Sequence, residues 1–210
     1  MKAAIFDVDG TLLDSMGIWH TITRRFFERR NIEMTQEMWD DYKDKPLEET
    51  LPQISVIFDL GMSADEVKAE FWALAEAEYR DNIPLKDGAF EYVRRLHDEG
   101  VRIGIATSGF EGMCADAFKR VGIADCIDAY AFSSEVGCGK DRPDVYLLAA
   151  KRLGVEPAEC VVYEDIVKGI KAAAGAGFGT CALFDESNAD ETELLIRCSD
   201  RYITGWTELL

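Results

Sequence analysis

The chain has 210 residues, 48% of them apolar, which is enough for one large domain or a core domain with a modest insert. Its 40 acidic and 23 basic residues give a formal net charge of −17, which repels nucleic acid and anionic membranes. We therefore expect neither as a partner. The N-terminal segment does not resemble a signal peptide, and no apolar run approaches membrane-spanning length. These features predict a cytoplasmic protein, with a monomer as the default.

Five apolar runs, each followed directly by polar residues, predict buried parallel strands. They cover residues 3–6, 101–106, 129–132, 160–163 and 179–184. Amphipathic helical patterns lie between them, and several end at a glycine, which is favoured at a helix C-terminus. This alternation predicts an α/β fold with a doubly wound parallel sheet. Ligands of such sheets bind beyond the carboxyl ends of the strands, where the polar residues collect.

Residues 15–85 break the alternation, because they contain no convincing strand. Helical stripes of apolar residues begin at Ile18 and at Val67, and two shorter helical segments lie between them. We therefore predict an all-helical insert over 15–85, placed between the two parts of the α/β core, 1–14 and 86–210. Packing within the insert is the expected role of most of its aromatic residues.

The first predicted strand ends in Asp7-Val8-Asp9-Gly10-Thr11, a pattern that suits a magnesium-assisted nucleophile. Magnesium takes oxygen ligands, usually one or two carboxylates together with substrate phosphate. The carboxylate of Asp7 can attack phosphorus and form an aspartyl-phosphate. Asp9 can protonate the leaving alkoxide and then deprotonate the attacking water. The alternative is an acidic turn in which Gly10 allows the backbone conformation of the turn and Thr11 caps a helix.

Two further segments offer groups that bind phosphate. Thr107, Ser108 and Gly109 follow the second strand, and they provide hydroxyls and closely spaced backbone amides for phosphoryl oxygens. Lys140 comes shortly before a predicted helix, where its ammonium can neutralise both Asp7 and the phosphoryl group in transfer.

Glu164 and Asp165 follow the fourth strand and provide two more carboxylates for a metal ion. Each feature has an ordinary structural alternative: Ser108 or Asp165 as a helix cap, and Lys140 as a solvated charge. The four features together favour the functional interpretation over four coincidences.

With these four motifs the chain resembles the haloacid dehalogenase-like hydrolases. The four motifs of that family match, in order and spacing, residues 7–11, 107–108, Lys140 and 164–165. Residues 164–177 are similar to the subgroup of beta-phosphoglucomutase and phosphoglycolate-type phosphatases. The resemblance covers essentially the whole chain. It implies a Rossmann-like core with a helical cap inserted after the first motif.

The resemblance also implies roles for individual residues. Asp7 would be the nucleophile, Asp9 the general acid/base, Thr107 a ligand of the phosphoryl group and Lys140 a charge clamp. The implied Mg²⁺ ligands are the Asp7 side chain, the Asp9 backbone carbonyl and the Asp165 side chain, with Glu164 assisting. The implied reaction is hydrolysis of a small phosphorylated metabolite.

Other reactions of the family are less compatible with the sequence. Dehalogenases lack the second aspartate, since a halide needs no proton, so Asp9 argues against dehalogenation. Phosphonatases need a cap lysine that forms a Schiff base. Lys43 and Lys45 lie in an acidic stretch, where a lowered pKa is not expected.

A mutase of the beta-phosphoglucomutase type is the main alternative. Such caps contain a histidine soon after the first motif and an arginine that grips the non-transferring phosphate. Here Trp19 stands at the histidine position, His20 lies one residue later, about 100° round a helix, and the arginine position falls near Leu47. These departures favour a phosphatase. A non-catalytic scaffold is a third possibility, but no motif position is degraded.

The substrate itself is weakly constrained by the sequence. The residues of the insert that are candidates to face it are Ser15, Met16, Trp19, His20 and Lys45. Trp19 and Met16 favour an apolar or stackable leaving group, with packing inside the protein as the alternative.

Overall fold

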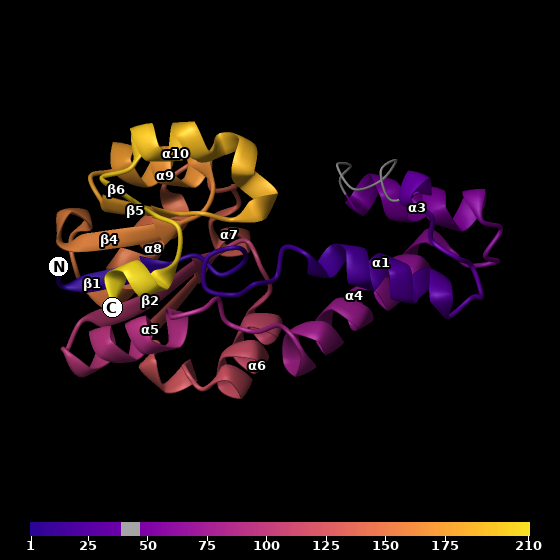
Figure 1. The fold of residues 1–210 in the computed structure, drawn as a ribbon, viewed down its shortest axis with the longest axis horizontal. Helices are drawn as coiled ribbons and strands as arrows, with labels where there is room; N and C mark the ends of the chain where they lie inside the picture. Colours follow the sequence, from indigo (N-terminus) through magenta and orange to yellow (C-terminus); the bar gives the residue numbers. More distant parts are fainter. Residues whose placement is uncertain (39–46) are drawn as a thin grey trace. The chain divides into compact units, whose positions relative to one another are not determined.

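The computed structural model describes residues 1–38 and 47–210, which form two compact units. Met1–Met16 and Ile83–Leu210 make up the larger unit, and Gly17–Asn82 the smaller one (Figure 1). Ser15 and Met16, which we expected in the insert, therefore belong to the larger unit.

The larger unit is built on a six-stranded sheet in which every described strand pairing is parallel. The strand order is β3-β2-β1-β4-β5-β6. The strands are β1 (Ala3–Phe6), β2 (Arg102–Thr107), β3 (Ala129–Phe132), β4 (Cys160–Glu164), β5 (Gly179–Leu183) and β6 (Arg201–Ile203). This arrangement confirms the predicted Rossmann-like sheet and its five predicted strands. The sequence pattern does not predict β6, because this edge strand has only three residues and begins with an exposed arginine.

Helices alternate with these strands along the chain. The α-helices are α5 (Ala89–Asp98), α6 (Glu111–Val121), α7 (Ser133–Val136), α8 (Asp144–Leu153), α9 (Val167–Gly175) and α10 (Thr192–Cys198). Short 3-10 helices are η1 (Ala124–Cys126), η2 (Pro157–Glu159), η3 (Glu186–Glu191) and η4 (Trp206–Leu209). As predicted, α6 and α8 end at Gly122 and Gly154, whose φ angles of 80° and 67° favour glycine.

The two faces of the sheet are covered by different helices (Figure 1). On one face α8 packs against β1, β2 and β3, and α9 packs against β4 and β5. Ile5 and Val162 are fully buried in the core beneath these helices. Side chains alternate along a strand, so Phe6 turns to the opposite face, where α5 and η4 lie.

An aromatic cluster fills that opposite face close to the end of β1. The Phe6 ring stacks on Tyr163 with centroids 4.7 Å apart, and it lies 5.6 Å from the ring of Trp206. Tyr92 from α5 stacks on Trp206 at 5.3 Å. The indole Nε1 of Trp206 donates a hydrogen bond of 3.1 Å to the backbone oxygen of Thr11. Trp206 therefore ties the C-terminal segment to the turn that follows β1.

The smaller unit is helical. Its described residues include the α-helices α1 (Ile18–Glu28), α3 (Leu47–Ile57) and α4 (Ala64–Asp81), and no strand occurs among them. Phe26 and Phe27 of α1 are completely buried, and the Phe26 ring lies 4.8 Å from that of Phe71 on α4. These contacts confirm that aromatic residues of the insert serve its own core.

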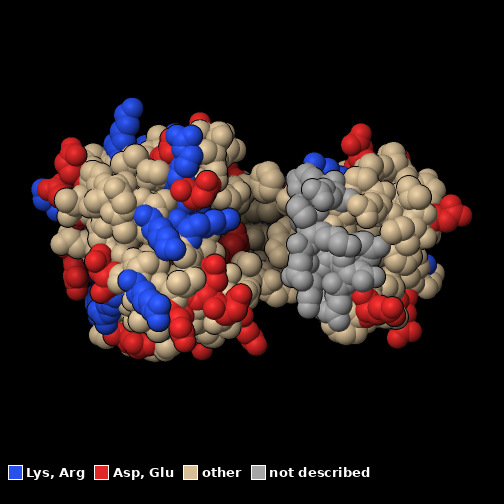
Figure 2. Space-filling view, turned by 90° about the horizontal axis from the view of Figure 1, so that it is seen from above, with Lys and Arg blue, Asp and Glu red and all other residues tan. Residues whose placement is uncertain are grey.

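The surface reflects the composition of the chain. On the visible face of the larger unit, Lys and Arg side chains are interspersed with Asp and Glu (Figure 2). None of the helices in the described part of the chain combines the length and apolarity that crossing a bilayer demands.

We predict that Trp206→Ala destabilises the larger unit by about 3–5 kcal/mol, because it leaves a large cavity and removes a buried hydrogen bond. Guanidinium denaturation of the full chain measures this loss. Leu194→Ala is the control, since Leu194 is 46% exposed and should change the free energy of unfolding little. A loss below about 1 kcal/mol for Trp206→Ala would contradict the packing described here.

Candidate active site

Three carboxylates meet at the carboxyl ends of the two central strands. In the parallel register of β1 and β4, Phe6 pairs with Tyr163, so Asp7 and Glu164 are the next residues on neighbouring strands. One carboxylate oxygen from each of Asp7, Glu164 and Asp165 lies within 4.8 Å of the others. The three residues are only 4%, 1% and 2% exposed. Strand pairing thus forces like charges together in a buried place.

Lys140 lies against this cluster, just before α8. Its side chain is 5% exposed, and its Nζ donates to Oδ1 of Asp7 and, at 2.8 Å, to Oε2 of Glu164. Burial alone would lower the pKa of the ammonium, but the charges of Asp7 and Glu164 outweigh burial and raise it. Lys140 is therefore a fixed cation beside the proposed nucleophile.

The three carboxylates carry more negative charge than the single positive charge of Lys140 can offset. Burial, followed by the charge of Asp7, raises the pKa of Asp165 to about 7. The same two causes raise the pKa of Glu164, although Lys140 opposes the shift. Buried oxygen donors with surplus negative charge fit a hard divalent cation such as Mg²⁺. Asp7, Glu164 and Asp165 are the side chains that could hold it.

The turn after β1 brings the backbone up to these carboxylates. Gly10 has a φ of 82°, and its backbone N–H donates to the oxygen of Leu13 at 3.0 Å. A Cβ added at Gly10 would collide with the carboxylate of Asp165. Glycine is thus required here for both conformation and space.

Asp9 lies at the edge of the cluster and is half-buried. Ser15 is buried, and its hydroxyl donates a hydrogen bond of 2.7 Å to Oδ1 of Asp9. The hydroxyl of Ser15 is thus engaged with the side chain of Asp9, and the role that we expected for Ser15 in facing the substrate stays a prediction. The contact fixes the carboxylate that we expect to transfer protons.

The loop after β2 borders Asp9. Thr107 is buried, and its Oγ1 accepts a hydrogen bond of 2.9 Å from the backbone N–H of Gly109. A Cβ added at Gly109 would lie 3.4 Å from Oδ2 of Asp9. Ser108 is exposed, and its hydroxyl lies 3.0 Å from that of Ser133. The loop therefore places hydroxyls and amides beside the proposed acid/base.

The candidates in the helical insert have a different setting. The ring of Trp19 meets that of Trp72 edge-to-face at 6.1 Å, and both Trp19 and His20 are half-buried. Lys43, Lys45 and the side chain of Leu47 lie outside the described residues. A substrate-facing role for Trp19, His20 and Lys45 stays a prediction.

Three residues that the sequence analysis did not assign to the site contact its carboxylates. Thr11 Oγ1 donates to Oδ1 of Asp165 at 3.2 Å, and Asn188 Nδ2 donates to Oδ2 at 2.8 Å. The Tyr146 hydroxyl donates to Oε2 of Glu164 at 3.1 Å. Thr11 belongs to the first motif and Tyr146 to the helix after Lys140, so position alone could have suggested both. Asn188 lies in a segment without any motif.

Comparisons with known proteins agree with this geometry. A sequence profile of the haloacid dehalogenase-like hydrolases matches residues 1–177. Validoxylamine A 7'-phosphate phosphatase from Streptomyces hygroscopicus subsp. limoneus is 30% identical over 199 residues, which cover 93% of each chain. Beta-phosphoglucomutase from Bacillus subtilis is 30% identical over 186 residues, covering 84% of this chain and 80% of the mutase.

The fold is also shared with solved structures. The structure of CbbY from Rhodobacter sphaeroides in complex with phosphate matches with a TM-score of 0.75 at 21% identity, covering 100% of this chain and 96% of that one. At this identity the match concerns the fold alone. The sequence profile, however, spans most of the chain, including all the residues of the carboxylate cluster. The chain therefore belongs to the haloacid dehalogenase-like hydrolases.

Proposed function

We propose that this protein is a Mg²⁺-dependent phosphatase that hydrolyses a small phosphorylated metabolite, with Asp7 as its nucleophile. The observation that supports this most directly is the buried cluster of Asp7, Glu164 and Asp165 with Lys140 bound against it. When a carboxylate attacks a phosphate, the negative charges of both groups must be offset. In this cluster Lys140 and a metal ion held by the carboxylates would offset them. The phosphatase relative in Streptomyces supports the same class of reaction.

In the first half of the proposed reaction, a carboxylate oxygen of Asp7 attacks phosphorus. The bond between phosphorus and the leaving oxygen breaks, and Asp9 gives its proton to that oxygen as it departs. Asp7 and Asp165 would hold the metal together with the backbone carbonyl of Asp9, and Glu164 would assist. Bound there, Mg²⁺ supplies charge stabilisation for the phosphoryl oxygens. Lys140, which contacts Asp7 and Glu164, offsets part of the remaining negative charge.

In the second half, Asp9 takes a proton from water, whose oxygen attacks phosphorus and releases inorganic phosphate from Asp7. The hydrogen bond from Ser15 keeps the carboxylate of Asp9 oriented through both proton transfers. Thr107 and the amides that follow it would hold the phosphoryl oxygens.

A phosphomutase is the second candidate, because a beta-phosphoglucomutase shares the same 30% identity as the phosphatase relative, over a shorter stretch of the chain. Both reactions share the transfer of a phosphoryl group to Asp7. They differ in whether water or a sugar hydroxyl accepts it. Trp19 at the position of the mutase histidine favours water.

We expect a screen of phosphorylated sugars and polyols with Mg²⁺ to release inorganic phosphate from at least one of them. Phosphorus NMR separates the two candidates, since hydrolysis gives free phosphate and a mutase moves the phosphoryl group within the sugar. Conversion of a sugar 1-phosphate to its 6-phosphate without release of phosphate would replace the phosphatase with the mutase.

We predict that Asp7→Asn leaves a folded protein with kcat lowered by at least about a thousandfold, because the attacking carboxylate is lost. Circular dichroism checks the fold, and released phosphate gives the rate. Asp9→Asn is the matched comparison. It should form the phosphoenzyme rapidly only from aryl phosphates, whose leaving groups need little protonation. Appreciable turnover by Asp7→Asn would rule out the mechanism.

The raised pKa of Asp165 predicts a pH-dependent effect of Mg²⁺ on stability. Without the metal, ionising Asp165 costs the folded state more than the unfolded state, so this cost grows as pH rises from roughly 4 to about 7. Mg²⁺ binds the ionised carboxylates and offsets their repulsion, whereas protons compete with it in acid.

The increase in melting temperature on adding Mg²⁺ should therefore be larger near about pH 8 than near about pH 5. Thermal denaturation of the full chain with and without the metal measures it. Asp165→Asn is the control and should lose most of the effect. An equal increase at both pH values would contradict the assigned metal ligands.

A further inference from the structure

Each oxygen of the Asp165 carboxylate accepts a hydrogen bond from a neutral side chain. Thr11 donates to Oδ1 at 3.2 Å and Asn188 donates to Oδ2 at 2.8 Å. We propose that Asn188 is a positioning residue that orients Asp165 for the metal ion, and that the ion pair of Lys86 with Asp185 holds Asn188 in place. This inference rests on the proposed function, because Asp165 is a metal ligand only within it.

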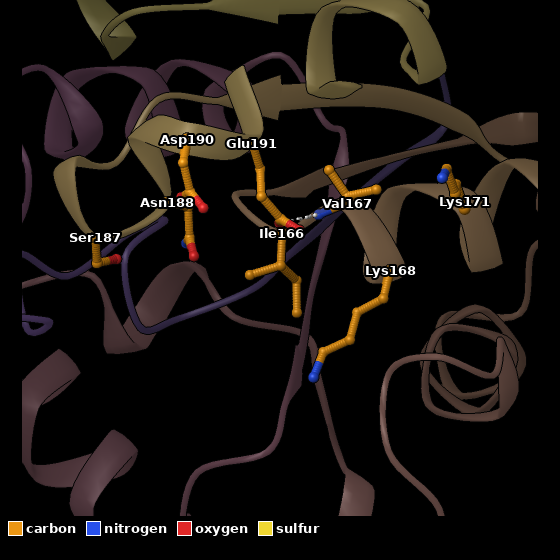
Figure 3. Close-up of a pocket in the computed structure, with 8 residues that line it drawn as sticks. All are labelled: Ile166, Val167, Lys168, Lys171, Ser187, Asn188, Asp190 and Glu191. Carbon is orange, nitrogen blue, oxygen red and sulfur yellow. Dashed lines mark hydrogen bonds between the residues drawn. The ribbon is translucent and has the colours of Figure 1, made fainter. Parts of the chain in front are cut away.

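The segment that presents Asn188 is tightly organised. The carboxylate of Asp185 accepts hydrogen bonds from the backbone N–H of Ser187 at 2.9 Å and from its hydroxyl at 2.5 Å. The backbone N–H of Asn188 donates to the backbone oxygen of Asp185 at 3.1 Å. At the far end of η3, Glu191 accepts from the N–H of Val167 at the start of α9, as Figure 3 shows. Both ends of this segment are therefore fixed.

Asn188 breaks the helical conformation within η3. Its φ and ψ angles are −120° and 24°, which depart from those of a 3-10 helix. In Figure 3 its side chain projects into the pocket that η3 forms with Ile166 and Lys168. Ile166 is the residue after Asp165, so the pocket lies next to that carboxylate. The non-helical conformation of Asn188 therefore directs its amide to the carboxylate of Asp165.

Lys86 anchors the segment from another part of the chain. Its Nζ lies 2.7 Å from Oδ2 of Asp185 and donates to the backbone oxygen of Phe184 at 3.0 Å. The side chains of Lys86 and Asp185 are 16% and 7% exposed, so the pair is largely shielded from water. The backbone N–H of Lys86 donates to the oxygen of Leu12 at 2.9 Å. Lys86 thus links the turn after β1 with the segment that presents Asn188.

An amide suits this position electrostatically. Asp165 already lies beside the carboxylates of Asp7 and Glu164, so a further anion would add repulsion. A cation in place of Asn188 would neutralise Asp165 and compete with Mg²⁺ for it. The amide N–H orients the carboxylate and leaves its charge available to the metal. Removing a side chain that donates a hydrogen bond to a metal ligand typically lowers the metal affinity about tenfold to a hundredfold.

Isothermal titration of the full chain with Mg²⁺ tests the role of Asn188 without relying on turnover. We expect Asn188→Ala to bind Mg²⁺ about tenfold to a hundredfold more weakly than the wild type. Asp190→Asn is the matched control, because it alters the same helix at an exposed residue and should leave the affinity nearly unchanged. If Asn188→Ala folds poorly, Asn188→Leu, which is similar in size and donates no side-chain hydrogen bond, gives the same comparison. Equal affinity of wild type and variant would overturn the inference.

The anchor is tested by combining substitutions. Lys86→Gln should weaken Mg²⁺ binding in the wild type, while Lys86→Arg, which keeps the charge, should weaken it less. If Lys86 acts through Asn188, then Lys86→Gln causes no further loss in the Asn188→Ala background. Additive losses would overturn this link. A wild type that binds no Mg²⁺ refutes the proposed function, whereas binding that Asn188→Ala leaves unchanged refutes only the present inference.

Discussion

The active site depends on the repulsion among three buried carboxylates, Asp7, Glu164 and Asp165, at the carboxyl ends of the two central strands. Neighbouring strands lie about 4.8 Å apart, so the parallel register of β1 and β4 brings Asp7 beside Glu164, and Asp165 follows in the chain. Moving these carboxylates apart would require breaking strand pairs whose side chains are buried on both faces. The apolar core of the sheet therefore holds the charges together, and their repulsion would be reduced by a cation bound among them.

The neighbours of the cluster are adapted to its crowding. At Gly10 a Cβ would collide with Asp165, and at Gly169 in α9 a Cβ would come within 2.6 Å of the Tyr146 hydroxyl and 2.7 Å of Cγ of Glu164. Two glycines from distant parts of the chain thus leave space for two carboxylates. The backbone packs directly on the charged groups, which excludes water and strengthens each interaction among them.

The sequence is informative wherever a repeating physical rule applies. Apolar runs ending in polar residues predict β1 and β4, and the geometry of parallel sheets then predicts that Asp7 and Glu164 approach each other. Periodic apolar stripes likewise predict the helices α1 and α4 of the insert. The rule fails for β6, whose few residues on a sheet edge show no buried pattern, and for Asn188, whose contact with Asp165 depends on a turn far along the chain. Lys86 likewise looks like an ordinary solvated lysine until its partner Asp185 is known.

The hydrogen-bond donors around the cluster divide into two kinds, and the division has an electrostatic logic. Asp7 and Glu164 share the ammonium of Lys140, which lowers the free energy of holding the two anions side by side, and Glu164 also accepts a hydrogen bond from the Tyr146 hydroxyl. Asp165 instead receives a hydroxyl from Thr11 and an amide from Asn188, both neutral. A neutral donor fixes the direction of a carboxylate but leaves its charge, which a second lysine would cancel. The fixed cation thus lies beside the nucleophile that we propose, and the charge of Asp165 stays available for the proposed metal ion.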